Sequence, residues 1–374
     1  EQFSKTLFEQ IQALRPKDVA ISGLQVQDGL SVQLTCTASN RLSPSQYTQD
    51  LRSTNWFADV NYTGFTYNES KKKIKFRDRR MFMIIDAHLH LWDRQCGRVD
   101  EKPVFALCEG KSNFGGEIRQ MMPPYMLDGR NTAEMLIANM NYARVSGCVV
   151  TQEYIDGNQD RYLLECKKKY PERMKICCLY EEREIDSEWI GQFDGIKICA
   201  GRLRDQNLLH HKEIFAKADR LGRFISIDLS DGDLQVKEME KLIKMYPDLR
   251  IAIGHFGMVT TNGWEEQIAL ARHKNVYVES GGITWLFHKE FYPYPSAIQA
   301  IRTAIGICGI EKIMWGSDYP RTMTAITYDM SKDFIEKTSA LSEEEKNRIL
   351  GENAKDFYGF PDLDVPEKIR NMVE

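Results

Sequence analysis

The sequence lacks long hydrophobic runs, a strong net charge and an apolar leader. Among its 374 residues, no apolar run approaches the roughly 20 residues that a membrane-spanning helix requires. Residues 1–15 contain no hydrophobic core of a signal peptide. The formal net charge of −4 gives no sign of the basic surface that binds nucleic acids. We therefore expect neither a membrane nor a nucleic acid as a partner.

Cysteine patterns typical of disulfide frameworks or zinc sites are also absent. The nine cysteines are an odd number at irregular spacing, and no CxxC motif occurs. Four of them, Cys148, Cys177, Cys178 and Cys199, lie in or beside apolar runs typical of buried strands. A reduced thiol packs there as a small hydrophobic group. The pattern favours a reducing cytoplasm over an extracellular disulfide-stabilised fold.

The N-terminal part differs in character from the rest. Residues 1–80 follow the order αββαββ, which is consistent with a small ferredoxin-like α+β domain, with a hairpin turn at Asp28-Gly29. The expected elements are a helix at Ser4–Leu14, strands at Val19–Val26 and Leu30–Ala38, a helix at Ser43–Ser53, and strands at Phe57–Phe65 and Lys73–Phe76. The charged stretches Lys71–Lys73 and Arg77–Arg80 predict a solvated linker. A natural two-domain chain and a fusion of two separate parts remain alternatives.

Parts of this segment resemble the periplasmic domain of PilN-type assembly proteins of type IV pili. The resemblance lies in Leu24–Ala38, in Tyr47–Leu51, and in Trp56–Val60 followed by Tyr62–Gly64. It implies a binding or scaffolding unit that docks a protein partner. A generic small α+β domain is the alternative, and the segment contains no histidine.

From Met83 onward, segments typical of buried strands alternate with segments of helical periodicity. Eight strands with intervening helices over residues 81–374 predict a (β/α)8 TIM-like barrel. An open doubly wound sheet is the alternative, but no GxGxxG motif follows the first strand. The expected strands are Met83–His88, Gly147–Glu153, Met174–Tyr180, Gly195–Cys199, Arg223–Leu229, Arg250–His255, Val276–Ser280 and Lys312–Asp318.

A long segment, residues 94–130, separates the first strand from the first barrel helix. We expect a loop at the catalytic face of the barrel that acts as a lid or as a wall against the substrate. An inert excursion of the chain is the alternative.

Two histidines follow the first buried strand. His88 and His90 are two residues apart, so on a strand their side chains point to the same side. Imidazole is a common ligand of zinc and other divalent metals. Behind a buried strand that also carries Asp86, the pair favours a metal site over two structural histidines.

In a barrel of this type, reactive groups lie at the carboxyl ends of the strands. The polar or reactive residues expected there are His88, His90, Glu153, Tyr154, Lys197, Cys199, Asp228, His255, Glu279, Ser280 and Asp318. Three of the seven histidines of the chain belong to this set, which random placement would rarely produce. The convergence predicts one polar site at that end of the barrel.

Three stretches at these positions resemble the amidohydrolase superfamily, and most closely its amidohydrolase-related branch of lactonases, hydratases and decarboxylases. They are His88-x-His90, Ile251–Gly257 and Ile313–Pro320. Residues 84–93, which include Trp92, look like the sugar-lactonase members of that branch. The resemblance covers residues 83–360.

The resemblance implies roles for these residues. His88 and His90 would bind a divalent metal, usually zinc, and Asp318 would ligate the metal or act as general base on the attacking water. His255 would polarise the substrate carbonyl or move a proton. Where metal-using members commonly have a further histidine, this chain has Asp228. Asp228 can ligate zinc or manganese through oxygen, and a site that works without metal is the alternative.

Other side chains are candidates for binding the substrate. Lys197 and Arg321 could hold an anionic group, with a buried structural lysine and a surface arginine as the alternatives. Trp92 is a further candidate. Arg202 and Arg204, in the loop after the fourth strand, rank below Lys197 and Arg321.

The sequence thus predicts a cytoplasmic hydrolase that activates water at a metal-assisted site and cleaves a lactone, ester or amide of a small molecule. One alternative is a non-oxidative, metal-dependent decarboxylase of a carboxylate substrate. The other is a non-catalytic protein whose first 80 residues dock a partner. A homo-oligomer is compatible with each of them.

Overall fold

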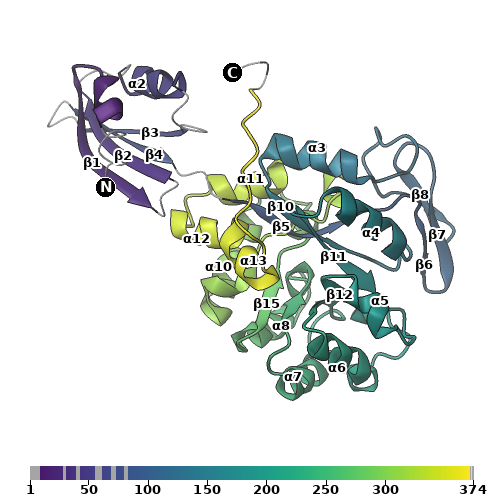
Figure 1. Cartoon of the computed structure of the whole chain (residues 1–374). Helices are drawn as coiled ribbons and strands as arrows, with labels where there is room; N and C mark the ends of the chain where they lie inside the picture. Colours follow the sequence, from purple (N-terminus) through teal and green to yellow (C-terminus); the bar gives the residue numbers. More distant parts are fainter. Residues whose placement is uncertain are drawn as a thin grey trace. The chain divides into compact units, whose positions relative to one another are not determined.

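The computed structural model describes residues 9–27, 31–38, 43–54, 61–68, 73–79, 83–370 and 372. The chain divides into two compact units, Glu1–Phe82 with Glu367–Glu374, and Met83–Pro366 (Figure 1). In the part of the chain that the structure describes, no helix is both long enough and apolar enough to cross a membrane.

The N-terminal unit contains a four-stranded antiparallel sheet with the strand order β1-β2-β4-β3. Its described elements are β1 (Val19–Gln27), β2 (Ser31–Ala38), α2 (Ser43–Arg52), β3 (Asn61–Asn68) and β4 (Lys73–Arg79). Tyr47 of α2 donates a hydrogen bond to the carbonyl oxygen of Ile11 at 2.7 Å, and both side chains belong to a core with Val19 and Cys36. A buried hydrogen bond therefore joins α2 to the helical residues 9–13 within an apolar core.

The order of the described elements agrees with the predicted one, with two corrections to their bounds: β3 continues to Asn68 instead of ending at Phe65, and β4 continues beyond Phe76. Arg77–Arg79, predicted as part of a linker, belongs to β4, because the backbone of this central strand pairs with a neighbour on each side. The predicted turn at Asp28-Gly29 lies outside the described residues, as does the first part of the predicted helix Ser4–Leu14, of which residues 9–13 are helical. The ferredoxin-like assignment and the PilN resemblance stay predictions.

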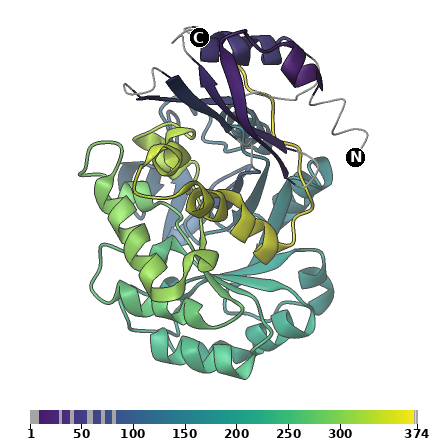
Figure 2. The same ribbon diagram turned by 90° about the vertical axis from the view of Figure 1, so that its left-hand side faces the viewer.

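The second unit is the predicted (β/α)8 barrel. Its eight parallel strands follow one another around the sheet in sequence order, and helices cover the outside (Figure 1 and Figure 2). The strands are β5 (Ile85–His90), β10 (Gly147–Thr151), β11 (Met174–Leu179), β12 (Gly195–Cys199), β13 (Phe224–Asp228), β14 (Ile251–Ile253), β15 (Val276–Glu279) and β16 (Ile313–Met314). The α-helices of this unit are α3 (Ala133–Ala143), α4 (Asp160–Lys169), α5 (Ser187–Gly191), α6 (Lys212–Arg220), α7 (Val236–Met245), α8 (Trp264–Ala269), α9 (Ile283–Leu286), α10 (Pro295–Cys308), α11 (Met330–Lys337), α12 (Glu343–Asn347) and α13 (Asn353–Tyr358).

Two strands end before the candidate site residues that we expected on them, and the reason lies in the backbone of the site. β14 ends at Ile253 and β16 at Met314, whereas we expected strands up to His255 and Asp318. His255 and Asp318 have φ angles of 51° and 56°, which no extended strand accommodates. Both candidate residues therefore lie on turns that follow their strands.

Residues 315–319, which follow β16, close the barrel by running beside β5. The amide of Asp318 donates to the carbonyl oxygen of His88 at 2.9 Å, and the amide of His90 donates to that of Tyr319 at 2.9 Å. The first and last strands of the barrel consequently meet along the segments that carry the candidate site residues.

At the end of the barrel unit, α13 packs against β5 and β16, and no loop separates it from α12. A π-helical turn, Arg348–Glu352, joins α12 to α13. Gly351 in this turn lies so close to the residues preceding β5 that a Cβ atom would be 1.8 Å from the carbonyl oxygen of Met83. The close approach of the two backbones requires glycine at this position.

Gly351→Ala is expected to lower the free energy of unfolding by about 3 kcal/mol, because one of the two backbones has to move. Gly306→Ala is the matched control, since a Cβ atom on Gly306 of α10 would have no neighbour within 4 Å outside the backbone of its own helix, and alanine favours helix by roughly 0.5–1 kcal/mol. Urea denaturation monitored by circular dichroism measures both. Equal stability of the two variants would contradict the packing described for Gly351.

Residues 94–130 form a small sheet instead of the predicted loop. Four short strands make an antiparallel meander in the order β6-β7-β8-β9: β6 (Cys96–Val99), β7 (Lys102–Ala106), β8 (Lys111–Phe114) and β9 (Glu117–Gln120). The sequence did not reveal them because each strand has only four or five residues and few of these are apolar.

Candidate functional site

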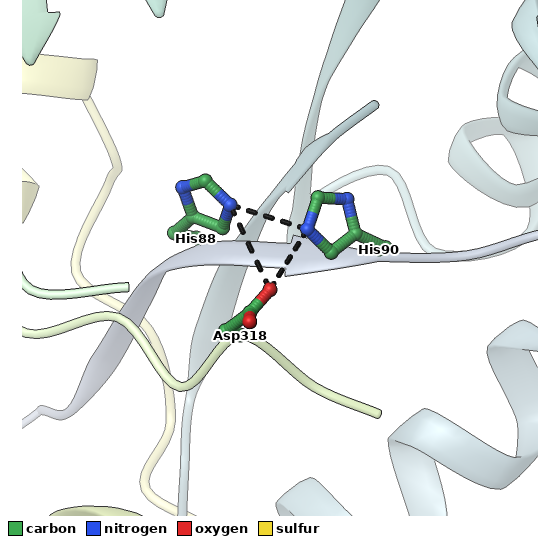
Figure 3. Close-up of side chains that lie close together, drawn as sticks. All are labelled: His88, His90 and Asp318. Carbon is green, nitrogen blue, oxygen red and sulfur yellow. Dashed lines mark hydrogen bonds and ion pairs between the residues drawn. The ribbon is translucent and has the colours of Figure 1, made fainter. Parts of the chain in front are cut away.

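His88 and His90 of β5 and Asp318 after β16 form a compact triad (Figure 3). The Nε2 atoms of the two histidines are 3.2 Å apart, and Asp318 Oδ1 lies 2.9 Å from His90 Nε2 and 4.0 Å from His88 Nε2. All three side chains are almost completely buried. Two imidazole nitrogens and a carboxylate oxygen that face one point are a donor set suited to a divalent cation.

A carboxylate behind His88 fixes the tautomer of its ring. Ionised Glu279, at the end of β15, can only accept, so His88 Nδ1–H donates to Glu279 Oε1 at 2.6 Å. The lone pair of Nε2 then points at the triad. The same carboxylate accepts from the backbone amides of His255 at 3.2 Å and Gly281 at 2.5 Å. A histidine held by a carboxylate in this way is typical of metal ligands.

Asp318 is held by side chains as well as by the seam of the barrel. Trp285 Nε1–H donates to Asp318 Oδ2 at 2.6 Å, which leaves Oδ1 directed at the two histidines. Asp86 accepts from the amide of Ser317 at 2.8 Å and from the amide of His88 at 3.2 Å, so one carboxylate oxygen links the two segments. Burial raises the pKa of Asp86 to about 6 despite these hydrogen bonds.

A second group of possible ligands shares His88. Asp228 and His255 each place one ligand atom near it, whereas Asp228 does not group with His90 and Asp318. His255 Nδ1 donates to the carbonyl oxygen of Gly281 at 2.9 Å, and its Nε2 lies 3.6 Å from Asp228 Oδ2. The other oxygen of Asp228 accepts from the buried Lys197 Nζ at 2.6 Å. Asp228 is thus tied to the barrel interior on one side and open to the site on the other.

The charges around the site favour a neutral imidazole beside an ionised carboxylate. Burial lowers the pKa of His90, and the positive charge of Arg321 lowers it further. Burial alone would raise the pKa of Asp318, but the hydrogen bond with His90 and the nearby positive charges hold it far below its usual range. Burial would lower the pKa of His255, but the carboxylates of Asp228 and Asp318 raise it.

A cavity of about 640 Å³ opens above these residues. Its wall includes His90, Asp228, His255 and Asp318 from the barrel, and Phe114, Arg119, Gln120 and Met121 from the β8–β9 region. The small sheet therefore forms one wall of the cavity, which agrees with the wall that we expected from residues 94–130. The volume suits a small organic molecule.

The substrate-binding candidates differ in their access to this cavity. Arg321 lines it, and so does Arg202, which pairs with Glu153. Lys197 is fully buried against Asp228, as expected of a structural lysine. Trp92 is also fully buried and lies with its ring 5.8 Å from the Arg321 guanidinium, without lining the cavity.

Three residues at the site were not assigned a role from the sequence. Glu279 was noted only as a strand-end residue, and its spacing gave no sign of a bond to His88. Trp285 follows β15 within an apolar stretch that gave no polar signal. Asp156, whose two oxygens lie 2.7 Å from Arg321 Nη2, comes three residues after the expected strand-end Glu153. For Glu279 and Asp156, the sequence signal was a polar residue at or shortly after the end of a strand. Trp285 had no such signal.

Comparison with known proteins gives a family match for most of the barrel. The model of the amidohydrolase family matches residues 85–360. The uncharacterized protein y4mH of Sinorhizobium fredii (strain NBRC 101917 / NGR234) is 27% identical over 147 residues, which cover 36% of this chain and 48% of that protein. The chain thus matches about half the length of this curated relative.

Solved structures match the barrel over almost their whole length. A probable 2-pyrone-4,6-dicarboxylic acid hydrolase from Acinetobacter baumannii, with citric acid bound, has a TM-score of 0.55 at 17% identity and covers 74% of this chain and 99% of its own. A putative enzyme of the same description from Pseudomonas putida has a TM-score of 0.56 at 19% identity, with 75% and 99% covered. An amidohydrolase from Burkholderia multivorans with bound zinc has a TM-score of 0.54 at 15% identity, with 75% and 100% covered. At sequence identities of 15–19%, these matches show a shared fold and no more.

Proposed function

The chain belongs to the amidohydrolase family, and we propose that it hydrolyses a lactone, ester or amide of a small molecule that carries an anionic group. The triad of His88, His90 and Asp318 carries this proposal (Figure 3). Three buried donor atoms converge there, and the Glu279 carboxylate prepares one of them for a cation.

The residues fit a divalent metal, which we propose to be zinc, with manganese as the second choice. His88, His90 and Asp318 would hold it, and Asp228 is a further candidate ligand, since its Oδ2 has no hydrogen-bond partner among the described residues. When bound, such an ion lowers the pKa of water and polarises a carbonyl.

The chain's own residues account for the movement of protons. Asp318 Oδ1 faces the triad and can accept the proton of the attacking water, while Trp285 holds the other oxygen. His255 Nε2 faces the cavity beside Asp228 Oδ2, so a proton on Nε2 can be delivered to the substrate oxygen or to the leaving group. Burial of the triad keeps bulk water from competing with these hydrogen bonds.

Arg321 supports an anionic group on the substrate. Its Nη2 atom pairs with Asp156, whereas Nε and Nη1 are buried without a hydrogen-bond partner among the described residues. Unpaired buried N–H groups are costly, and an anionic group on the substrate would accept from such a charged donor. We propose that Lys197 acts as the partner of Asp228 and that Trp92 supports Arg321. Neither residue would contact the substrate itself.

The proposal is tested with a panel of lactones that includes a pair differing only in one carboxylate. Wild-type protein should hydrolyse the anionic member, lose activity in EDTA and regain it with zinc or manganese. Arg321→Met should raise KM for the anionic lactone about 10- to 100-fold more than KM for the neutral one. Hydrolysis is followed by acid release, and metal content by elemental analysis.

Each other outcome assigns a different function. Carbon dioxide release from a carboxylic acid would make the protein a decarboxylase. Hydrolysis that withstands EDTA and is lost in Asp318→Ala would support a metal-free lactonase. A protein with no turnover and no metal would fit the binding-protein hypothesis, in which residues 1–80 dock a partner. For the enzyme we propose a cytoplasmic location, in keeping with nine cysteines of which none forms a disulfide in the part of the chain that the structure describes.

A further inference from the structure

A row of buried hydrogen bonds leads from the small sheet to Arg321. Ser112 of β8 donates its hydroxyl hydrogen to Gln95 Oε1 at 2.7 Å, and Gln95 Nε2 donates to Asp156 Oδ1 at 3.0 Å. Arg321 Nη2 then lies 2.7 Å from both oxygens of Asp156. Ser112, Gln95 and Asp156 are at most 2% exposed, so water does not compete for these bonds.

The amide of Gln95 is the group that this position requires. An ionised Asp156 can only accept, so the amide nitrogen has to face it and the amide oxygen has to face a donor, which is Ser112. The backbone of Asp156 is fixed as well, because its carbonyl oxygen accepts from Cys96 N at 3.1 Å and from Gln159 Nε2 at 2.9 Å. The carboxylate of Asp156 therefore has one orientation.

That orientation determines where the Arg321 guanidinium lies. An arginine side chain has many rotamers, and a paired carboxylate selects among them. In this arrangement Arg321 Nη1 lies 3.9 Å from Asp318 Oδ1, and the donors Nε and Nη1 remain without a hydrogen-bond partner among the described residues. Arg321 thus keeps a donor, Nη1, near the triad.

We propose that Gln95 and Ser112 are positioning residues that hold Arg321, through Asp156, in the orientation that binds the anionic group of the substrate. The inference rests on the proposed function, in which Arg321 binds that group. It gives the β6–β9 sheet a part in substrate selection besides that of a wall, since Ser112 lies on β8 and Gln95 directly precedes β6.

Binding of isophthalate, a rigid dianion without a hydrolysable bond, tests the proposal by calorimetry on the full chain. Arg321→Met should weaken binding about 100-fold, and Gln95→Glu and Gln95→Leu about tenfold each. Gln95→Glu replaces the amide nitrogen that donates to Asp156 by an oxygen. Because the two side chains have nearly the same shape, the packing is preserved. Ser112→Ala should have a smaller effect in the same direction.

Asn353→Leu is the matched control, because Asn353 is a buried amide that donates to the carbonyl oxygens of Ile310 and Ile313 at 2.7 Å and does not line the cavity. It should lower the melting temperature and leave the isophthalate affinity within about twofold of wild type. In hydrolysis of an anionic lactone, Gln95→Glu should raise KM with kcat nearly unchanged.

The outcomes separate this inference from the proposed function. If Arg321→Met weakens binding and both Gln95 variants bind like the wild type, the positioning role is overturned and the anion site stands. If Asn353→Leu weakens binding as much as Gln95→Leu, the effect is general destabilisation and the inference is also overturned. If wild type and Arg321→Met bind equally, or neither binds, both proposals fall.

Discussion

His90→Ala should leave the purified protein with less than about a tenth of the wild-type metal content and lower kcat/KM on the order of 10³-fold or more. The reason is geometric, since His90 Nε2 lies between the other two donors, 3.2 Å from His88 Nε2 and 2.9 Å from Asp318 Oδ1. The substitution removes one of the two imidazole donors, so the ligands that remain are His88, Asp318 and the proposed Asp228, and one imidazole with two carboxylates binds zinc more weakly than the full set. Elemental analysis and lactone turnover measure the two effects.

The matched control is His273→Ala, because the His273 side chain is about one-third exposed and its Nε2 lies 4.0 Å from Glu240 Oε1, away from the triad. This variant should keep wild-type metal and activity. Wild-type metal content in His90→Ala would remove the triad as the metal site. Loss of activity in His90→Ala with no metal in either protein would leave His90 a role in catalysis and reject the metal.

Asp228→Ala should lower the free energy of unfolding by about 3–5 kcal/mol. The large effect arises at Lys197, whose side chain is completely buried and whose ammonium group lies 2.6 Å from Asp228 Oδ1. Removing Asp228 leaves a buried positive charge without its carboxylate, and Ser226 Oγ at 3.5 Å is a weak substitute. Urea denaturation measures the loss.

The double variant Asp228→Ala/Lys197→Met should recover most of that stability, since it removes both charges together. It also isolates the other role proposed for Asp228, because it should fold and yet bind zinc more weakly than the wild type. Unchanged zinc affinity would restrict the ligands to His88, His90 and Asp318. A double variant as unstable as Asp228→Ala would show that the ion pair is not the source of the effect.

Hydrophobic patterning was sufficient to predict the barrel, since each strand forms a short apolar run between helical segments. It could not predict the four strands within residues 94–130, whose exposed surfaces carry no periodic signal and whose pairing depends on tight turns such as Gly115-Gly116. It also placed His255 and Asp318 on strands, because a positive φ angle leaves no trace in the pattern of apolar residues.

For the candidate site, the position of a residue at the end of a strand could be read from the sequence, whereas the contacts between side chains could not. His88, His90, His255 and Asp318 were singled out because they follow strands, and the structure brings them together. The bonds between Glu279 and His88 and between Asp156 and Arg321 depend on side-chain directions across the barrel. A single sequence contains no record of such contacts, so Lys197 and Arg321 looked equivalent although only Arg321 reaches the cavity.

The seam between β5 and residues 315–319 has a consequence for how this protein is made. His90 and Asp318 are 228 positions apart in the chain, so the pocket between them does not exist until the last strand has been synthesised and has met the first. Closing so long a loop is entropically unfavourable. An ion bound by residues of both segments would stabilise the closed barrel relative to a barrel in which the first and last strands have not yet paired.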